Sequence, residues 1–243
     1  TEPIAVAYCA AKLREVLGGK PEEVLAEVSG NILKNVKSVV VPNTDGRRGI
    51  DAAIAVGIVA GDADAELQVI ANVTEDDAAA IQGYLDATPI KVTCPVTPCL
   101  LDIFLHGKRA GHTAAVRVAN NHTNIIYMER DGEVLLEKPL TANAEDNLQD
   151  KSVLNVKDII TFAETVPLDR IEPVIGRQIA CNTAIAEEGL RNSWGANIGS
   201  TLLQRSDDIE TQARAWAAAG SDARMNGCEM PVVICSGSGN QGI

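Results

Sequence analysis

The sequence predicts an α+β protein in which a mostly antiparallel sheet region is followed by a helical region. Patterns typical of strands gather between residues 90 and 137, and long patterns typical of helices follow residue 156. Strands and helices are therefore partly segregated, whereas a doubly wound sheet requires them to alternate. The polar, acidic stretch 141–150 indicates a surface loop, so we divide the chain into 1–140 and 141–243, with one continuous domain as the alternative.

The first half begins with Thr1-Glu2-Pro3, a favourable helix start because Thr can cap the helix and Glu and Pro suit its first turn. Gly18-Gly19 ends this helix. Residues 22–29 largely alternate apolar and charged side chains, which predicts a strand with one buried face. The predicted elements are a helix over 4–17, a strand over 22–29, a short turn or helix over 32–37, a strand over 39–41, and helices over 49–60 and 74–85.

The second set of elements is separated by clear turn signals. Asp131-Gly132 is a strong hairpin signal, because both residue types tolerate the backbone that a tight turn needs. The predicted strands are 90–94, 100–106, 113–119, 122–130 and 133–137, and the predicted helices are 156–165, 170–192 and 198–219. A further apolar run over 231–234 resembles a strand and leads into glycines.

Composition restricts the class of ligand. The 243 residues are 46% apolar, which is enough for a substantial core, and 33 acidic against 21 basic residues give a formal charge of −12. This charge repels nucleic acid backbones and anionic membranes, so we expect neither as a partner. Aromatic residues make up only 3%, so stacking platforms for bases are not expected. A small polar or zwitterionic ligand fits this composition better.

The cysteine pattern predicts reduced thiols in a cytoplasmic protein. The sequence shows no signal peptide, and a chain of this size does not depend on disulfides. Cys94 and Cys99 are separated by four residues, with no second pair or histidine at zinc-site spacing. The six cysteines, which are Cys9, Cys94, Cys99, Cys181, Cys228 and Cys235, therefore give no metal motif.

Polar turns directly after predicted strands are candidate binding loops, since sites are commonly built on loops at strand ends. Asn31 and Lys34 follow one strand, Asn43 follows another, and His122 and Asn124 precede an apolar run. Near the chain end, glycines alternate with small polar residues, so several backbone N–H groups could converge on an anion. Solvated turns, a satisfied strand-end histidine and a flexible tail are the alternatives. If the fold brings these loops together, they form one pocket of amino-acid size.

Seven segments of the chain resemble segments of one known family. They are residues 1–4, 29–35, 41–44, 122–125, 198–202, 221–225 and 236–243. The most specific are Ser221 to Met225 and Ser236 to Ile243. In this order they resemble the iron–sulfur L-cysteine desulfidases, which are related to the alpha chain of iron–sulfur L-serine dehydratase. The chain resembles the N-terminal and central portion of that family.

The resemblance implies a lyase that converts L-cysteine and water to pyruvate, ammonia and hydrogen sulfide without pyridoxal phosphate. A [4Fe–4S] cluster held by three cysteines would leave one iron open as a Lewis acid, and a cysteine directly before Thr1 would take the α-proton. The cluster cysteines would follow Ile243, so no metal ligand is assigned in this chain. We therefore expect the chain alone to bind no cluster, to be inactive, and to need the C-terminal cluster-binding portion, on the same chain or as a separate subunit.

The resemblance also implies roles for single residues. Arg224, Ser236, Ser238 and Asn240 are expected to bind substrate, with Arg224 a candidate for its carboxylate. Asn31, Lys34, Asn43, His122 and Asn124 are further candidates that line the pocket, and Glu2 is a candidate for orienting the cysteine base. L-serine dehydratase activity and a non-catalytic amino-acid-binding subunit are the alternatives, and a homo-oligomer is compatible with either.

Overall fold

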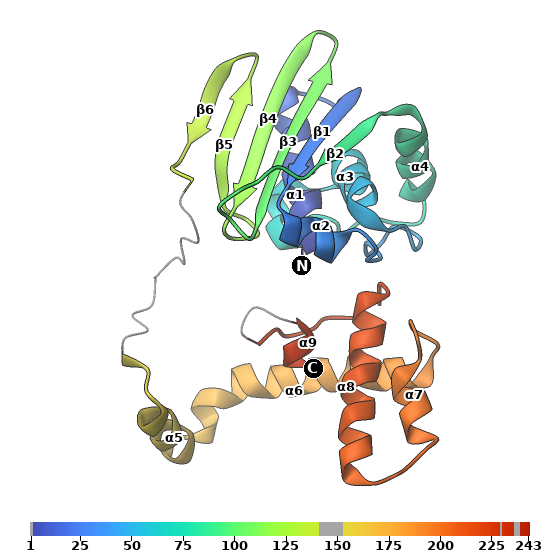
Figure 1. Ribbon diagram of the computed structural model, residues 1–243, viewed down its shortest axis with the longest axis vertical. Helices are drawn as coiled ribbons and strands as arrows, with labels where there is room; N and C mark the ends of the chain where they lie inside the picture. The colour runs from blue at the N-terminus through green and yellow to red at the C-terminus, as the bar shows by residue number, and fades with distance from the viewer. Residues whose placement is uncertain (1, 141–152, 229, 236–238) are drawn as a thin grey trace. The chain divides into compact units, whose positions relative to one another are not determined.

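The computed structural model describes residues 2–140, 153–228, 230–235 and 239–243, and the chain divides into two compact units, Thr1–Glu145 and Asp146–Ile243. All strands of the described ranges lie in unit 1, and unit 2 is mainly helical (Figure 1). This distribution confirms the α+β class. Within the described ranges, no helix combines the length and the apolar character needed to cross a bilayer.

Unit 1 is built on a six-stranded sheet with the order β2-β1-β3-β4-β5-β6. The strands are β1 (Glu23–Val28), β2 (Ile90–Thr93), β3 (Asp102–Arg109), β4 (His112–Ala119), β5 (Ile125–Arg130) and β6 (Glu133–Glu137). Only the β1–β2 pair is parallel, so the sheet is mostly antiparallel as predicted. Asp131 and Gly132, at φ 51° and 83°, form the hairpin turn between β5 and β6, which confirms that prediction.

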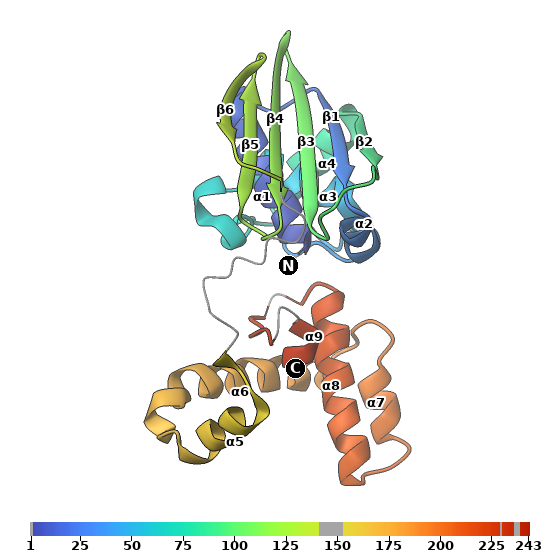
Figure 2. The same cartoon turned by 60° about the vertical axis from the view of Figure 1, so that its left-hand side comes forward.

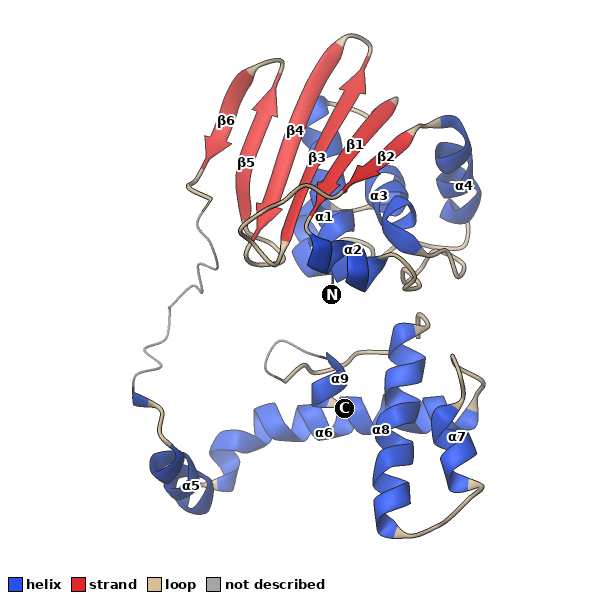
Figure 3. Ribbon diagram, in the orientation of Figure 1, coloured by secondary structure: helices blue, strands red, loops and turns tan. Residues whose placement is uncertain are grey.

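Helices cover one face of this sheet (Figures 2 and 3). They are α1 (Glu2–Leu17), α2 (Gly30–Val36), α3 (Gly49–Ala60), a 3₁₀ helix η1 (Ala63–Gln68) and α4 (Asp77–Ala87). α1 is central, because it packs against β3 and β4 on one side and α3 on the other. The core is accordingly made of small and branched residues.

Two contacts fix α1 in this position. A Cβ added at Gly57 of α3 would lie 2.2 Å from the carbonyl oxygen of Ala7, so the two helix backbones touch and only glycine fits. The buried thiol of Cys9 lies 3.4 Å from the Val116 carbonyl oxygen, to which it donates. Burial raises the pKa of the Cys9 thiol, which keeps it protonated.

The other face of the sheet carries an aromatic and charged cluster. Arg117 of β4 donates to both carboxylate oxygens of the buried Asp102, at 2.8 and 2.7 Å. Its guanidinium carbon also lies 5.1 Å from the centre of the Phe104 ring, and Tyr127 meets that ring edge-on at 5.8 Å. The ion pair and the ring contacts hold these side chains in fixed positions across three neighbouring strands.

Unit 2 contains α5 (Val156–Thr165), α6 (Leu168–Arg191), α7 (Ile198–Leu203), α8 (Ile209–Met225) and α9 (Gly239–Gly242). α8 packs on both α6 and α7. Close contacts again depend on glycine, because a Cβ added at Gly189 of α6 would lie 2.1 Å from the carbonyl oxygen of Ala219. A Cβ at Gly199 of α7 would lie 2.4 Å from the carbonyl oxygen of Ala215.

Three predicted elements differ from the structure. The strand over 39–41 is a buried loop with a single bridge between Val40 and Arg48, and Pro42, which has no N–H group, follows it directly. The helix over 198–219 is interrupted between α7 and α8, because the Asp208 carboxylate accepts the N–H of Thr211 and begins a new helix. The run over 231–234 forms no strand, and residues 239–242 form a helical turn rather than an extended loop.

Candidate functional site

The candidate residues fall into two sets, one in each unit. Unit 1 carries Glu2, Asn31, Lys34, Asn43, His122 and Asn124, and unit 2 carries Arg224 and Asn240. Ser236 and Ser238 lie outside the described residues. The single pocket that the sequence predicts from all these loops stays a prediction.

The start of α1 and the exposed side of α2 meet in a polar cluster. The amide nitrogen of Asn35 donates to Glu2 Oε1 at 3.3 Å and, more weakly, to Asn31 Oδ1 at 3.5 Å. Asn31 and Asn35 are one helical turn apart, which places them on the same side of α2. The structure therefore brings Glu2 and Asn31 together through Asn35, which belongs to the polar segment 29–35.

Ser29 fixes the position of α2. Its buried hydroxyl accepts the Ile32 N–H at 3.3 Å as the helix cap and donates to the Leu100 carbonyl oxygen at 2.6 Å. One side chain thus starts the helix and ties it to the segment that leads into β3. Because the anchor is buried, the exposed side of α2 is presented in one orientation.

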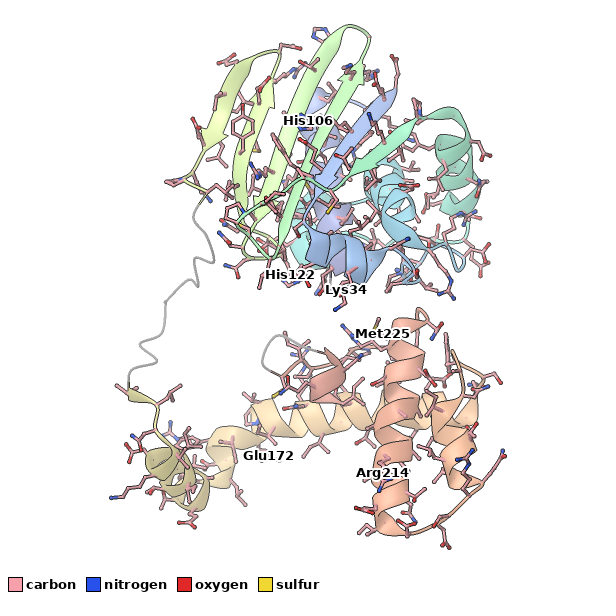
Figure 4. The ribbon with its side chains drawn as sticks, in the orientation of Figure 1. Lys34, His106, His122, Glu172, Arg214 and Met225 are labelled. Atoms are coloured by element: carbon pink, nitrogen blue, oxygen red, sulfur yellow. The ribbon has the colours of Figure 1, made fainter. Side chains whose placement is uncertain are left out.

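His122 and Lys34 lie at the end of unit 1 where α1 begins (Figure 4). Burial lowers the pKa of the His122 imidazole below its ordinary value of 6.5, while the charge of Glu2 acts in the opposite direction. The imidazole is therefore neutral at pH 7 and can accept a proton. We call Glu2, Asn31, Lys34, Asn35 and His122 the α1–α2 cluster.

The remaining candidates in unit 1 have amides bonded to the backbone. Asn43, at φ 58°, donates to the Ile70 carbonyl oxygen at 2.7 Å and so connects two loops. Asn124 donates to the Ala119 carbonyl oxygen at 3.0 Å, and Lys138 donates to its side-chain oxygen at 3.3 Å. The Asn124 bond closes a local turn, whereas the Asn43 bond joins two loops that are distant in the sequence.

In unit 2, Arg224 and Asn240 are in direct contact. Arg224 lies in the last turn of α8, and its Nη1 donates to Asn240 Oδ1 at 2.8 Å. A Cβ added at Gly239 would lie 2.4 Å from Arg224 Nε, so the backbone of α9 lies flat against the guanidinium group. Two of the substrate-binding candidates therefore form one preorganised group, which glycine makes possible.

Asp222, two residues before Arg224, has a structural role. Its Oδ2 accepts the Ile198 N–H at 3.0 Å, which satisfies a donor in the first turn of α7. The segment 221–225 therefore connects α7 through Asp222 and α9 through Arg224. A substitution of Asp222 would therefore be expected to displace α7, and not to remove a contact with a ligand.

Asn182 is the residue in unit 2 that sequence reasoning missed. Its amide nitrogen donates to the carbonyl oxygens of Val233 and Gly242, at 2.9 and 2.7 Å, and its oxygen accepts the Val233 N–H at 2.9 Å. These three bonds hold the 230–235 segment and α9 against α6. The sequence does contain a signal for this role. Asn182 is a polar residue on the apolar face of an amphipathic helix, where its amide must find buried hydrogen-bond partners.

A hollow of about 390 Å³ lies beside this contact. Its lining combines apolar side chains with three polar ones, which are Gln178, Asn182 and Thr183. The lining residues are Ile175, Gln178, Ile179, Asn182, Thr183, Ala186, Trp216, Gly242 and Ile243. None of these lining side chains is charged, so they offer no counter-charge to a zwitterion.

The described part of the chain does not fit an iron–sulfur cluster. In those ranges, no three side chains of His, Cys, Asp or Glu come together as metal ligands. A [4Fe–4S] cluster is held by several thiolates, and these residues do not assemble such a set.

The chain matches the model of a known family. The family described as "Serine dehydratase alpha chain" matches residues 64–243. No solved structure gives a significant match.

Curated relatives match over the whole chain. UPF0597 proteins of Treponema denticola, Desulfitobacterium hafniense and Lachnoclostridium phytofermentans are 44%, 46% and 46% identical to it. Each match covers 100% of this chain but only 57–58% of the relative. The chain therefore spans less than two-thirds of the length of these relatives.

Proposed function

Because the chain belongs to the serine dehydratase alpha chain family, we propose that it binds the amino-acid substrate of a β-eliminating lyase, with L-cysteine as that substrate. The products are pyruvate, ammonia and hydrogen sulfide, and one water is consumed. The contact that best supports substrate binding is the one between Arg224 and Asn240.

Arg224 binds the substrate carboxylate in this proposal. Asn240 and the α9 backbone hold the guanidinium in one orientation, so little side-chain freedom remains to be lost when an anion binds. A fixed guanidinium can donate two parallel hydrogen bonds to a carboxylate. A lysine ammonium group could not donate the same two parallel hydrogen bonds.

The α1–α2 cluster supplies polar groups of a different kind. Elimination of the thiol requires a base for the α-proton, and we propose that Glu2 orients that base while neutral His122 hydrogen-bonds the substrate. Asn31 and Lys34 offer an amide and a cation at the same end of unit 1.

The [4Fe–4S] cluster is an expectation from the resemblance alone, and no step above depends on it. An open iron would supply Lewis-acid chemistry. Because the described residues do not fit the cluster, we propose that its ligands lie in the polypeptide that longer relatives carry outside the match. Iron and sulfide analysis of such a protein, purified anaerobically, tests this directly.

Changing Arg224→Ala tests the substrate-binding role. The assay uses the protein together with any polypeptide that its gene encodes beyond these 243 residues, under anaerobic conditions. We expect the KM for L-cysteine to rise about 10- to 100-fold, because charged hydrogen bonds to the carboxylate are lost. Arg214→Ala is the matched control, since Arg214 lies on the same helix and pairs only with Glu210 at 2.9 Å among the described residues. An unchanged KM in Arg224→Ala would exclude Arg224 from the site.

L-Serine is the second candidate substrate, and the description of the matched family favours it. A hydroxyl replaces the thiol as leaving group, while the carboxylate and amino group are unchanged. Competition between cysteine and serine in one assay separates the two lyase activities. Binding of either amino acid without turnover would instead support the non-catalytic subunit.

A further inference from the structure

α6 carries one apolar stripe of which only half is packed. Its C-terminal half buries Asn182, Ile185, Ala186 and Gly189 against neighbouring elements, chiefly α8. The same helix face continues toward the N-terminus with Leu168, Ile171, Ile175 and Ile179, which follow the helical spacing of three or four residues. Leu168 is 77% exposed and Ile179 is 62% exposed. The helix therefore extends the packing face well beyond its partner (Figures 1 and 2).

α5 carries a second exposed apolar stripe. Its stripe of Val156, Ile159 and Ile160 follows helical spacing, Phe162 flanks it, and the helix has no buried residue. A ten-residue helix is only marginally stable by itself in water, so its stability normally comes from a packed face. We call these α5 side chains, together with Leu168, Ile171, Ile175 and Ile179 of α6, the α5–α6 stripe.

The hollow described above lies where the packed half of α6 meets the open half. Ile175 and Ile179 of the stripe line it together with the half-exposed Trp216 of α8. A hollow at the edge of a packed core is suited to receive a side chain from a further layer. Large apolar side chains exposed along a helix face in this way typically mark a protein contact.

The curated relatives contain polypeptide in addition to the region that matches this chain. They match this chain along its whole length, α5 and α6 included, and 42–43% of each relative lies outside the match. In each relative, the additional polypeptide is part of the same chain as the region that matches unit 2. The covalent link gives one copy per unit 2 and a high effective concentration. We propose that the α5–α6 stripe is the docking surface for an apolar face of this additional polypeptide. This proposal does not depend on the proposed activity.

The test uses a hybrid protein. The 243 residues of this chain replace the matched region of the Desulfitobacterium hafniense relative, and hydrogen exchange is compared between the hybrid and the 243-residue chain alone. We expect amides over 156–179 to exchange at least about 100-fold more slowly in the hybrid. If the hybrid is insoluble, the relative itself is measured, and the peptides aligned with 156–179 are expected to be protected.

Substitutions on two sides of the same helix provide the matched control. Ile175→Asp in the hybrid is expected to return exchange over 156–179 to within about 10-fold of the chain alone, because a buried unpaired carboxylate opposes docking. Arg177→Asp introduces the same side chain on the opposite side of α6 and should leave the protection unchanged.

Three results would overturn the proposal. Equal exchange in the hybrid and in the chain alone would show that the additional polypeptide does not cover the stripe. Protection already present in a monomeric chain would assign the cover to the 243 residues themselves. Protection that appears only with dimerisation of the chain would assign it to a second copy.

Discussion

Asn182 lies on the apolar face of α6, where a polar side chain is stable only when its hydrogen bonds are complete. All three bonds go to the backbone of a segment more than 50 residues away. The side chain thereby replaces the strand pairing that the apolar run 231–234 would otherwise need. This is why that run is ordered without belonging to a sheet.

Asn182→Ala is expected to lower the free energy of unfolding of unit 2 by about 2–3 kcal/mol, since buried carbonyl groups lose their donors. Urea denaturation followed by tryptophan fluorescence measures this, because both tryptophans, Trp194 and Trp216, lie in unit 2. Thr183→Ala, at the exposed neighbouring position, should change the value by less than about 0.5 kcal/mol. Equal effects of the two substitutions would contradict the role given to Asn182.

His122 gives a prediction about pH. Its folded-state pKa is lowered by burial from 6.5, so near that pH the unfolded state binds the proton more readily. The stability that neutral His122 contributes is therefore fully present above pH 6.5 and is lost as the pH falls from that value through the lower folded-state pKa. Titration of the imidazole signals by NMR should give a midpoint below 6.5, with His122→Gln identifying the signal. A midpoint at or above 6.5 would contradict this.

At the residue scale, the sequence predicted which polar residues have specific hydrogen-bond partners. It predicted less well what those partners are. Arg224 and Asn240 were selected together, and they are in contact. Asn182 was not selected, because its importance depends on partners brought close only by folding. Asn43 and Asn124 were selected as pocket residues, and their amides bond backbone carbonyl groups, of a distant loop for Asn43 and of a local turn for Asn124.

Contacts between elements depend strongly on glycine. In unit 1 the α1 and α3 backbones touch at Gly57, whereas a Cβ at Gly83 of α4 would meet nothing within 4 Å. The same residue type thus has opposite roles in two helices of one unit. Gly57 permits close packing of two helices, whereas Gly83 only increases the conformational freedom of the backbone.

Gly57→Ala is expected to destabilise unit 1 by about 1–3 kcal/mol, because α1 and α3 must move apart. Gly83→Ala should instead stabilise it by about 0.5–1 kcal/mol, since alanine favours the helix and no contact opposes it. Thermal or urea unfolding followed by circular dichroism measures both variants. A stabilising Gly57→Ala substitution would show that the two helices do not pack as described.

Element boundaries were predicted best where local signals act alone. The helices over 49–60 and 156–165 have the predicted bounds, because glycine or a capping side chain marks their ends. The division between α7 and α8 was missed, although Ser206 and Asp208 form a capping signal that competes with a continuous helix. The strand predicted over 39–41 was wrong because buried apolar residues there pack from a loop.

At the scale of the whole molecule, the two units differ in how much core they own. Unit 1 buries a large cluster of apolar side chains between its sheet and helices. In the described part of unit 2, the buried apolar residues are Ile185, Ala186, Ala215, Ala219 and Ala223. The fold class followed from the segregation of strand and helix patterns, but this imbalance did not, because periodicity does not reveal which apolar faces find partners.

We therefore expect unit 2 of the 243-residue chain to unfold at lower urea concentration than unit 1. Tryptophan fluorescence reports unit 2, and the strand signal in circular dichroism reports unit 1. In the hybrid described above, the fluorescence transition should move to higher urea. Coincident transitions in the chain alone would show that unit 2 is as stable as unit 1 without any further polypeptide.

The position of Cys9 has a practical consequence. Its thiol is buried between α1 and the sheet and is kept protonated, whereas Cys94 and Cys235 are exposed. Alkylating reagents act on accessible thiolates, so Cys9 becomes modifiable only when α1 separates from the sheet. In a protein whose exposed cysteines are replaced by serine, the rate of Cys9 alkylation would report the opening frequency of unit 1 without an introduced label.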